Sequence, residues 1–365
     1  MLDYLIVGCG LYGATFARSV TNAGKKCLII DKRNHIGGNT YTKKQSGIDV
    51  HMYGPHIFHT NSPKIWNYVN QFSEFNSYRH RVKCQSGDSL YSFPLNLNTL
   101  EEMWGPMGDG QLLEKLELQK APHQPKENLE DWAIAEVGED IYRKFIYGYT
   151  KKQWGKEPRD LPSFIIKRIP IRKNRDNDYH ECKFSGIPVD GYTKLIRNII
   201  DGIPCELGVD YLDRRDYWDS LARHVVYTGP IDDFFNHEYG TLEWRSLKFE
   251  HNIHDSEQRQ PVAQINYPED NVKFTRTVEH KHFNPTKTKK TVITTEYPQE
   301  YKKGREKFYP INDKRNNLLY EKYSLSINTT KYVLGGRLAR YKYYDMDQVI
   351  AASLKKSKNR LENST

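Results

Sequence analysis

The amino-acid sequence predicts an α/β protein with a Rossmann-type domain, a helical insert and an antiparallel β-sheet domain. Three observations support this prediction. The chain opens with a continuous apolar strand that runs into GCGLYG and a helical pattern, and a second apolar strand follows, which makes a β-α-β unit. Residues 88–150 carry mainly helical periodicity. Residues 242–300 show alternating stretches separated by turn residues, which is typical of antiparallel strands.

The composition is that of a folded protein with a large core. The 365 residues are 37% hydrophobic and 13% aromatic, which excludes a disordered chain. The net charge of +9 suits a phosphorylated small molecule, and the positive side chains form no single arm that would indicate nucleic-acid binding. Five cysteines without C-x-x-C spacing predict neither a disulfide framework nor a metal site. No signal peptide precedes the first strand and no apolar run reaches roughly 18 residues, so we expect a cytoplasmic protein without membrane insertion.

The predicted elements follow one another along the chain. Buried strands are predicted at 3–7, 25–31 and 224–230, and helices at 11–23, around 60–80, through most of 88–150 and at 191–200. Breaks in the helical part are marked by Pro94, Pro106 and Pro122. Residues 151–190 are irregular, and the chain ends with a strand, a glycine turn and a helix. We therefore expect a Rossmann-type domain at 1–80, continued by about 191–235 and 330–365, a helical substrate-lid domain at 81–150, and a sheet and mobile-loop domain at 151–190 and 236–329.

The first chemical signal is GCGLYG, which fits the pattern G-x-G-x-x-G between a strand and a helix. In this pattern Gly8 makes the turn, Gly10 lets the backbone approach a pyrophosphate, and Gly13 lets the helix pack on the strand. The helix N-terminus offers free N–H groups to the phosphates. Asp31 follows at the end of the second strand, where a carboxylate accepts hydrogen bonds from ribose hydroxyls. These features together predict a dinucleotide site.

Two further stretches refine the cofactor. DKRNHIGGN places Gly37, Gly38 and Asn39 after the second strand, where a nicotinamide dehydrogenase needs no glycine pair, so this stretch favours FAD over NAD. YGPHIFHTN places His56 and His59 three residues apart in an irregular loop. No acidic or cysteine cluster joins them, which disfavours a metal site and leaves a structural role or a position beside the flavin.

Longer motifs then carry a resemblance to a known family. YGPHIFHTN, GYTKKQWG, FIIKRIPIR, GIPVDGYTKLI, FTRTVEHKHF and GGRLARYKYYDM, in this order, resemble the UDP-galactopyranose mutase family over about residues 2–355. The resemblance implies FAD that is active when reduced, with NADH or NADPH as the reductant. It implies conversion between the pyranose and furanose forms of a nucleotide sugar, UDP-galactose first, through attack of reduced flavin N5 on the anomeric carbon. It also implies a homodimer and a downstream furanosyl transferase that builds a polysaccharide.

The resemblance also implies roles for individual residues. Arg168 and Arg276 match arginines that hold the diphosphate, and His56 and His59 match a loop against the flavin. The residues that match the substrate pocket are Phe145, Tyr149, Thr150, Trp154, Tyr179, Asn266, Tyr309, Tyr343 and His80. Trp154 is expected on a mobile segment that closes over the substrate. Arg337, Asp345 and Met346 match positions at the flavin.

Three residues depart from the family pattern and leave the substrate open. Pro55 replaces a small residue, Arg175 replaces an aromatic residue, and His180 follows Tyr179 where the family usually has Phe. We expect all three near the substrate. Sister mutases that act on dTDP-fucopyranose or UDP-N-acetylgalactosamine are therefore alternatives, although the N-acetyl enzyme carries Arg at the place of His59. Two alternatives of other classes are an FAD-dependent oxidoreductase, such as an amine oxidase, and a non-enzymatic nucleotide-binding protein.

Overall fold

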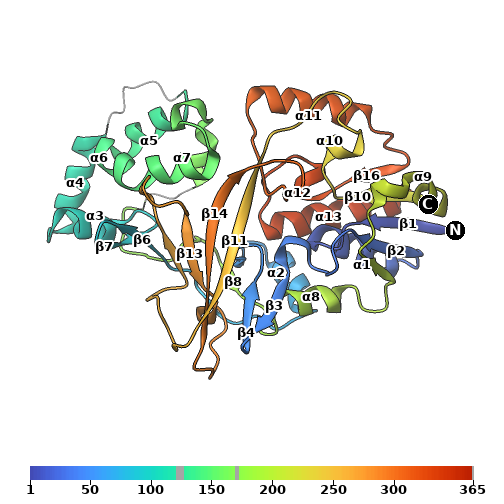
Figure 1. Cartoon of the computed structure of the whole chain (residues 1–365), viewed down its shortest axis with the longest axis horizontal. Helices are drawn as coiled ribbons and strands as arrows, with labels where there is room; N and C mark the ends of the chain where they lie inside the picture. Colours follow the sequence, from blue (N-terminus) through green and yellow to red (C-terminus); the bar gives the residue numbers. More distant parts are fainter. Residues whose placement is uncertain (121–126, 169–171, 364–365) are drawn as a thin grey trace.

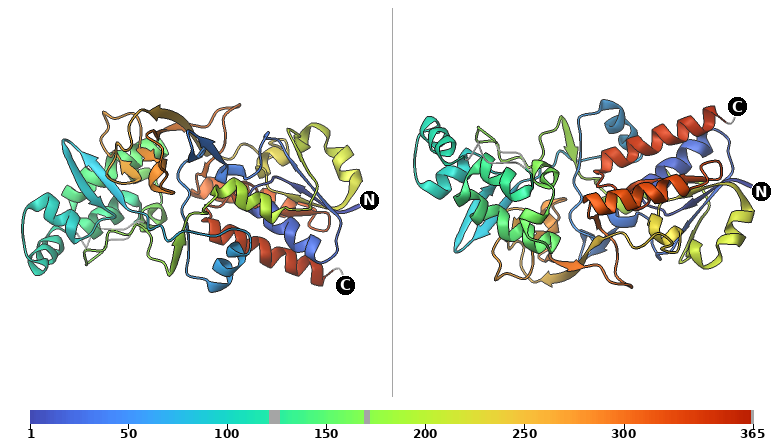
Figure 2. Two further views of the ribbon diagram at one scale, coloured as in Figure 1. Left: turned by 90° about the horizontal axis from the view of Figure 1, so that it is seen from below. Right: turned by 90° about the horizontal axis from the view of Figure 1, so that it is seen from above.

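The computed structural model describes residues 1–120, 127–168 and 172–363, without the side chains of residues 164, 167 and 168. Three regions follow one another along the long axis of the molecule (Figures 1 and 2). A domain built on a parallel sheet holds both chain termini at one end, a helical lobe forms the other end, and a large sheet lies between them. None of the helices in the described ranges is both long and apolar enough to cross a membrane.

The parallel sheet forms the Rossmann-type domain that the opening β-α-β unit predicts. Its five strands run in the order β16-β10-β1-β2-β9, and every neighbouring pair is parallel. Their bounds are Leu2–Val7 for β1, Cys27–Asp31 for β2, Cys205–Leu207 for β9, Ala222–Tyr227 for β10 and Tyr332–Leu334 for β16. Strands from distant parts of the chain therefore meet in one sheet, so that loops from several segments converge at its carboxyl edge.

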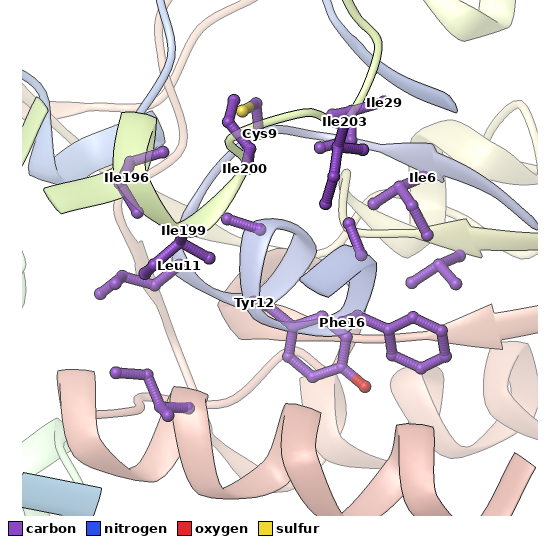
Figure 3. Packing of buried hydrophobic residues seen from close by; sticks show 14 of the residues in the cluster. Ile6, Cys9, Leu11, Tyr12, Phe16, Ile29, Ile196, Ile199, Ile200 and Ile203 are labelled. Carbon is purple, nitrogen blue, oxygen red and sulfur yellow. The ribbon is translucent and has the colours of Figure 1, made fainter. Parts of the chain in front are cut away.

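Helices cover both faces of this sheet, as the continuous apolar strands require. Tyr4 and Ile6 face one core together with side chains of α1, α2, α8 and α13, while Leu5 faces a second core beside α9, α10 and α11. Figure 3 shows Tyr12 and Phe16 of α1 within the first core. These helices span Leu11–Asn22 (α1), Pro63–Asn70 (α2), Gly191–Ile199 (α8), Arg215–Leu221 (α9), Ile231–Phe234 (α10), Lys314–Ser326 (α11) and Met346–Glu362 (α13), and the short α12 spans Gly336–Ala339.

The second sheet confirms the predicted β-region and has the order β15-β11-β14-β13-β12-β6-β7. Its neighbours are antiparallel except for β12 and β6, which are parallel. The bounds are Val82–Ser86 (β6), Ser89–Phe93 (β7), Trp244–His254 (β11), Gln264–Asn266 (β12), Arg276–Glu279 (β13), Thr291–Glu300 (β14) and Tyr309–Pro310 (β15). Two small pairs join β3 (Thr42–Gln45) to β4 (Ile48–His51) and β5 (Phe58–Thr60) to β8 (Phe184–Gly186).

Two secondary-structure predictions are wrong. The segment from 88 was expected to be helical, but β6 and β7 form a hairpin at the edge of the large sheet. The turn of the hairpin places Gly87 at a φ of +56°. In β6 the buried Val82 and Cys84 alternate with half-buried residues, which is the period-two pattern of a half-buried strand. We therefore propose that residues 82–93 belong to the sheet domain. The helix expected around 60–80 is only α2, which begins after the Ser62 cap and ends at Asn70.

The helical lobe lies beside this hairpin and supplies one wall of the site. It contains α3 (Leu97–Trp104), α4 (Asp109–Gln119), α5 (Leu129–Val137), α6 (Glu139–Ile141) and α7 (Gly148–Trp154). A π-helical segment, Tyr142–Tyr147, joins α6 to α7 without a break. π turns are frequent at functional sites because they change which side chains face a cavity. Of the predicted proline breaks, Pro106 follows the glycine that ends α3, whereas Pro122 lies outside the described residues.

Candidate active site

Two adjoining cavities lie between the parallel sheet and the large sheet. The first is lined by the carboxyl ends of β1, β2 and β10 and by the start of α1. The second is lined by α7, by β13 and β15, and by residues 53–61, which include β5 and which we call the histidine loop. The residues that line both cavities are Asn39, His56, Arg337, Tyr344 and Met346. A molecule bound in the first cavity therefore reaches the wall of the second.

The glycines of GCGLYG have two different roles in the first cavity. A Cβ at Gly8 would lie 2.0 Å from the Thr228 hydroxyl oxygen, and one at Gly13 would lie 1.9 Å from the carbonyl oxygen of Gly8. Packing therefore requires glycine at both positions, and Gly8 also needs it because its φ is +106°. Among the described residues, the nearest atom to a Cβ at Gly10 would be the Cα of Gly38 at 3.8 Å, so none of them fills this space. Bare backbone at the start of α1 fits the pyrophosphate of a dinucleotide.

Asp31 fixes the same loop from the end of β2. Its carboxylate accepts hydrogen bonds from the backbone N–H of Cys9 at 2.7 Å and of Arg33 at 2.9 Å. The Arg33 guanidinium in turn donates to Asn39 and forms an ion pair with Glu306 at 2.7 Å. Asp31 therefore lies in the cavity as predicted and also holds the glycine loop against the second strand.

The histidine loop places His56 at the junction of the cavities. Its Nδ1 lies 2.8 Å from the carbonyl oxygen of Gly54, which only accepts, so Nδ1 carries the proton and Nε2 keeps a lone pair. Its backbone N–H donates to Nδ1 of the buried His51 at 3.1 Å. Burial lowers the pKa of His56 to about 4, and the charges of Arg337 and Arg276 act in the same direction. His56 is therefore neutral at neutral pH.

A stack of imidazole rings forms the next part of the second cavity. The rings of His59 and His180 are parallel, with centroids 3.7 Å apart, and His80 lies behind them with its centroid 6.2 Å from that of His180. Burial lowers the pKa of His80 to about 3, and its Nε2 lies 3.3 Å from the side-chain oxygen of Gln264. Pro55 lines the same cavity. Two of the three departures from the family pattern thus lie at this wall.

Arg175, the third departure, does not line either cavity. Its guanidinium binds Asp109 at 2.7 Å and Glu101 at 2.5 Å on the helical lobe. The expectation that Arg175 lies near the substrate is therefore wrong, because two carboxylates on α3 and α4 hold the side chain on the outer surface. His180 and Pro55 remain as the departures that face the cavity.

The Arg276 guanidinium faces the second cavity and is bound from behind by Glu296. The two residues are paired across β13 and β14, and one carboxylate oxygen accepts from Nε at 2.9 Å and Nη2 at 2.8 Å. The Glu296 side chain is 1% exposed and that of Arg276 is 18% exposed. Burial alone would lower the pKa of Arg276, but the adjacent carboxylate offsets this effect and raises that pKa well above its ordinary value. Arg276 is thus a fixed, permanent cation.

We expect Glu296→Ala to leave the Arg276 guanidinium without its partner and to lower the free energy of unfolding by about 3 kcal/mol. Binding of UDP should weaken as well, because Glu296 no longer fixes the orientation of the Arg276 guanidinium. Glu296→Gln keeps an oxygen acceptor for the guanidinium, so its free energy of unfolding and its affinity for UDP should both fall less. Urea unfolding of the FAD-bound protein and titration with UDP measure the two effects. Equal stability and affinity in the alanine variant would show that Glu296 does not position Arg276.

Tyrosines make up most of the remaining wall. The rings of Tyr309 and Tyr343 are stacked with centroids 5.3 Å apart, and the Arg337 guanidinium carbon lies 4.7 Å from the Tyr343 centroid. Trp154, at the end of α7, has its ring 6.4 Å from that of Tyr309, and Tyr149 lines the same cavity. The predicted residues that line the second cavity are Asn39, His56, His59, His80, Tyr149, Thr150, Trp154, Tyr179, Arg276, Tyr309, Arg337, Tyr343, Asp345 and Met346.

Two predicted residues, Phe145 and Asn266, are not at this wall. Phe145 lies in the π segment and packs edge-on against Tyr91 inside the helical lobe, at 3% exposure. Asn266 is buried behind Gln264, whose amide N–H donates to it at 2.8 Å and whose side chain lines the cavity instead. Arg168 ends the 3₁₀ segment Ser163–Arg168, and its side chain lies outside the described residues.

Several wall residues were not predicted from the sequence. Tyr53, Gln153, Gln264 and Phe308 line the second cavity, and Glu296 holds Arg276. Two of them carried a local signal. Gln153 follows Tyr149 by four residues, a spacing that places both side chains on one face of a helix. Gln264 precedes Asn266 by two residues, a spacing that places both on one face of a strand. No local signal in the sequence pointed to Glu296, because only the pairing of β13 with β14 brings it to Arg276.

Comparisons with known proteins agree with this geometry. A family model described as UDP-galactopyranose mutase matches residues 144–343, and one for an NAD(P)-binding Rossmann-like domain matches residues 6–72. The chain is 36% identical to dTDP-fucopyranose mutase of Escherichia coli, with full coverage of both chains. It is 38% identical to a probable UDP-galactopyranose mutase of Klebsiella pneumoniae, over 97% of this chain and 93% of that one.

A solved structure shows the same fold. The crystal structure of reduced UDP-galactopyranose mutase superimposes with a TM-score of 0.79 at 14% identity, and the match covers 99% of this chain and 94% of that chain. The curated relatives are similar in sequence from end to end, and the family model alone spans more than half of the chain. The chain therefore belongs to the UDP-galactopyranose mutase family and is an isomerase, an FAD-dependent mutase of nucleotide sugars.

Proposed function

We propose that this enzyme interconverts UDP-galactopyranose and UDP-galactofuranose while its FAD is reduced. One observation carries the proposal. The dinucleotide cavity opens beside a second cavity whose described wall contains two arginines, Arg276 and Arg337, among six tyrosines. Arginines bind a diphosphate through a forked, charged geometry, and aromatic rings suit a base and a sugar. A nucleotide sugar has both parts.

The side chains of this chain have separate tasks in the reaction. The bond between the anomeric carbon and the diphosphate breaks, and the leaving oxygen gains negative charge. Arg276, fixed by Glu296, stabilises that charge, and Arg337 adds a second cation. Neutral His56 accepts a hydrogen bond from a sugar hydroxyl through Nε2. When bound in its reduced form, FAD supplies the nucleophile for the anomeric carbon, and the diphosphate returns after the sugar closes its other ring.

The glycine loop, Asp31 and the start of α1 would hold the FAD, and Asp345 and Met346 would lie against it at the second cavity. We further propose NADH or NADPH as the physiological reductant, since the reaction has no net redox change and the flavin must stay reduced. A homodimer and a downstream furanosyl transferase that takes the product complete the proposal.

A second candidate is a mutase that acts on dTDP-fucopyranose. The E. coli relative with that name matches this chain over its full length, and His180 and Pro55 line the second cavity where the family pattern differs. Both residues change the shape and polarity of the wall. The name of this relative is the reason to test a sugar that lacks one hydroxyl group beside UDP-galactose.

The test is an anaerobic assay with dithionite-reduced protein. UDP-galactofuranose and dTDP-fucopyranose are supplied separately, and the products are resolved by chromatography, with the oxidised protein as the control. We expect conversion of the UDP-sugar by the reduced protein and none by the oxidised protein. Conversion of the dTDP-sugar alone would replace the first candidate with the second. Absence of both conversions in protein that retains FAD would overturn the proposal.

A further inference from the structure

The ammonium group of Lys152, on α7, binds the backbone of the turn that connects β12 to β13 in the large sheet. Nζ lies within hydrogen-bond distance of four backbone carbonyl oxygens: Tyr267 at 2.7 Å, Glu269 at 2.7 Å, Val272 at 2.9 Å and Phe274 at 3.1 Å. We call these carbonyls the carbonyl cage. Within the described ranges, no carboxylate lies within ion-pair distance of this ammonium group. The charge is therefore held by backbone dipoles, and the contact fixes backbone to backbone.

The helix that carries Lys152 also carries part of the site. Tyr149, Thr150, Gln153 and Trp154 line the second cavity, whereas Lys152 reaches the turn of residues 267–274. α7 packs beside β14 at the end of the large sheet (Figure 1). One helix thus holds the cavity wall on one face and its anchor to the sheet on another.

A second cation holds the end of the same helix. Arg245 of β11 donates to the carbonyl oxygens of Gln153 at 2.8 Å and Lys152 at 3.1 Å. A cation at this end also complements the helix dipole. Trp154 is the last residue of α7, which the sheet binds at two points.

The turn of residues 267–274, which supplies the carbonyl cage, leads directly into β13, the strand of Arg276. Phe274 supplies the last carbonyl of the cage, and β13 begins at Arg276. Thr275, between them, donates its backbone N–H to the carbonyl oxygen of Glu296 at 3.0 Å. Lys152 therefore binds the chain at Phe274, only two residues before the cavity arginine Arg276. Its own backbone belongs to α7, which carries the aromatic wall.

We propose that Lys152 is a positioning residue that sets the spacing between the aromatic wall of α7 and the diphosphate-binding Arg276. This inference rests on the proposed function, because the spacing matters only for a ligand that contacts both parts at once. UDP contacts both, whereas uridine contacts only the aromatic wall. Loss of the anchor should therefore weaken UDP binding much more than uridine binding.

The experiment compares Lys152→Met with Lys151→Met in the FAD-bound, full-length protein. Lys151 is the adjacent lysine on α7, and its ammonium group pairs with Glu157 at 2.8 Å, away from the cage. We expect Lys152→Met to raise the Kd of UDP about tenfold, or ~1.4 kcal/mol, and to raise KM with a smaller change in kcat. The Kd of uridine and the FAD content should stay near those of the Lys151→Met control. The Tm should be lower than in that control, because four carbonyl oxygens lose their donor.

The outcomes separate this inference from the proposed function. Wild-type protein that binds neither UDP nor dTDP would contradict the proposed function itself. Wild-type protein that binds UDP, with an equal Kd in the Lys152→Met variant, would overturn the positioning role. Equal losses for UDP and uridine would also overturn it, because they would indicate a general structural defect. Lys152→Gln retains two N–H donors and should be intermediate; if the methionine variant does not fold, a wild-type Kd in the glutamine variant overturns the proposal.

Discussion

Arg276→Ala is expected to reduce kcat/KM for the nucleotide sugar by about 1,000-fold while FAD stays bound. The guanidinium faces the second cavity and is held by Glu296, so it meets the leaving diphosphate without reorganising. The interaction strengthens as negative charge develops, so kcat should fall as well as the affinity for substrate. Flavin absorbance per protein gives the FAD content, and the anaerobic chromatographic assay gives the rates.

Two further variants make this result specific. Lys273→Ala removes the same charge from an exposed side chain in the neighbouring turn and should retain wild-type rates. Arg276→Lys keeps the charge but loses the fork that binds two phosphate oxygens, and it should lie between the alanine variant and wild type. If Arg276→Ala turns over at nearly the wild-type rate, the diphosphate is bound elsewhere in the cavity.

Gly10→Ala is expected to weaken FAD binding by about 10- to 100-fold, equivalent to an overpacking cost of about 1–3 kcal/mol. The fold itself tolerates a methyl group here, since the nearest atom to the added Cβ is 3.8 Å away. The methyl group would occupy space that the pyrophosphate needs. The measurement is the Kd of FAD for deflavinated protein, together with the Tm of that protein.

Gly13→Ala and Gly110→Ala are the informative comparisons. At Gly13 the added Cβ would lie 1.9 Å from a backbone oxygen, so this variant should lose the fold as well as the cofactor. Gly110 lies on α4, and an added Cβ there would have no atom of the described part of the chain within 4 Å, so this variant should bind FAD like wild type. Wild-type FAD affinity in Gly10→Ala would mean that the cofactor does not approach this part of the backbone.

Local patterns predicted the elements that depend on neighbouring residues in the chain. The apolar run at β1, the glycines after it and the helical spacing of α1 are all encoded within some twenty residues, and the structure has them as expected. The hairpin at 82–93 was missed, because its short strands carry a weak period-two signal and its partner β12 lies far along the chain. Long-range pairing decided that segment.

The site divides in the same way. The motifs in the sequence predicted that Tyr149, Trp154, Arg276 and Tyr309 share one cavity, and the structure places them on its wall. No motif showed that Arg175 turns away to Asp109 and Glu101, since these partners belong to helices more than sixty residues earlier in the chain.

The sequence by itself determined the dinucleotide-binding unit, the mutase family and most of the side chains that the reaction uses, because these depend on residue type and on spacing along the chain. Only the tertiary structure decided which of them face the cavity and what holds them there. Glu296 behind Arg276, His180 stacked on His59, and Lys152 in its carbonyl cage are all contacts between segments far apart in sequence. Such contacts form when strands pair and helices pack, and the free energy of that packing decides them rather than any local preference.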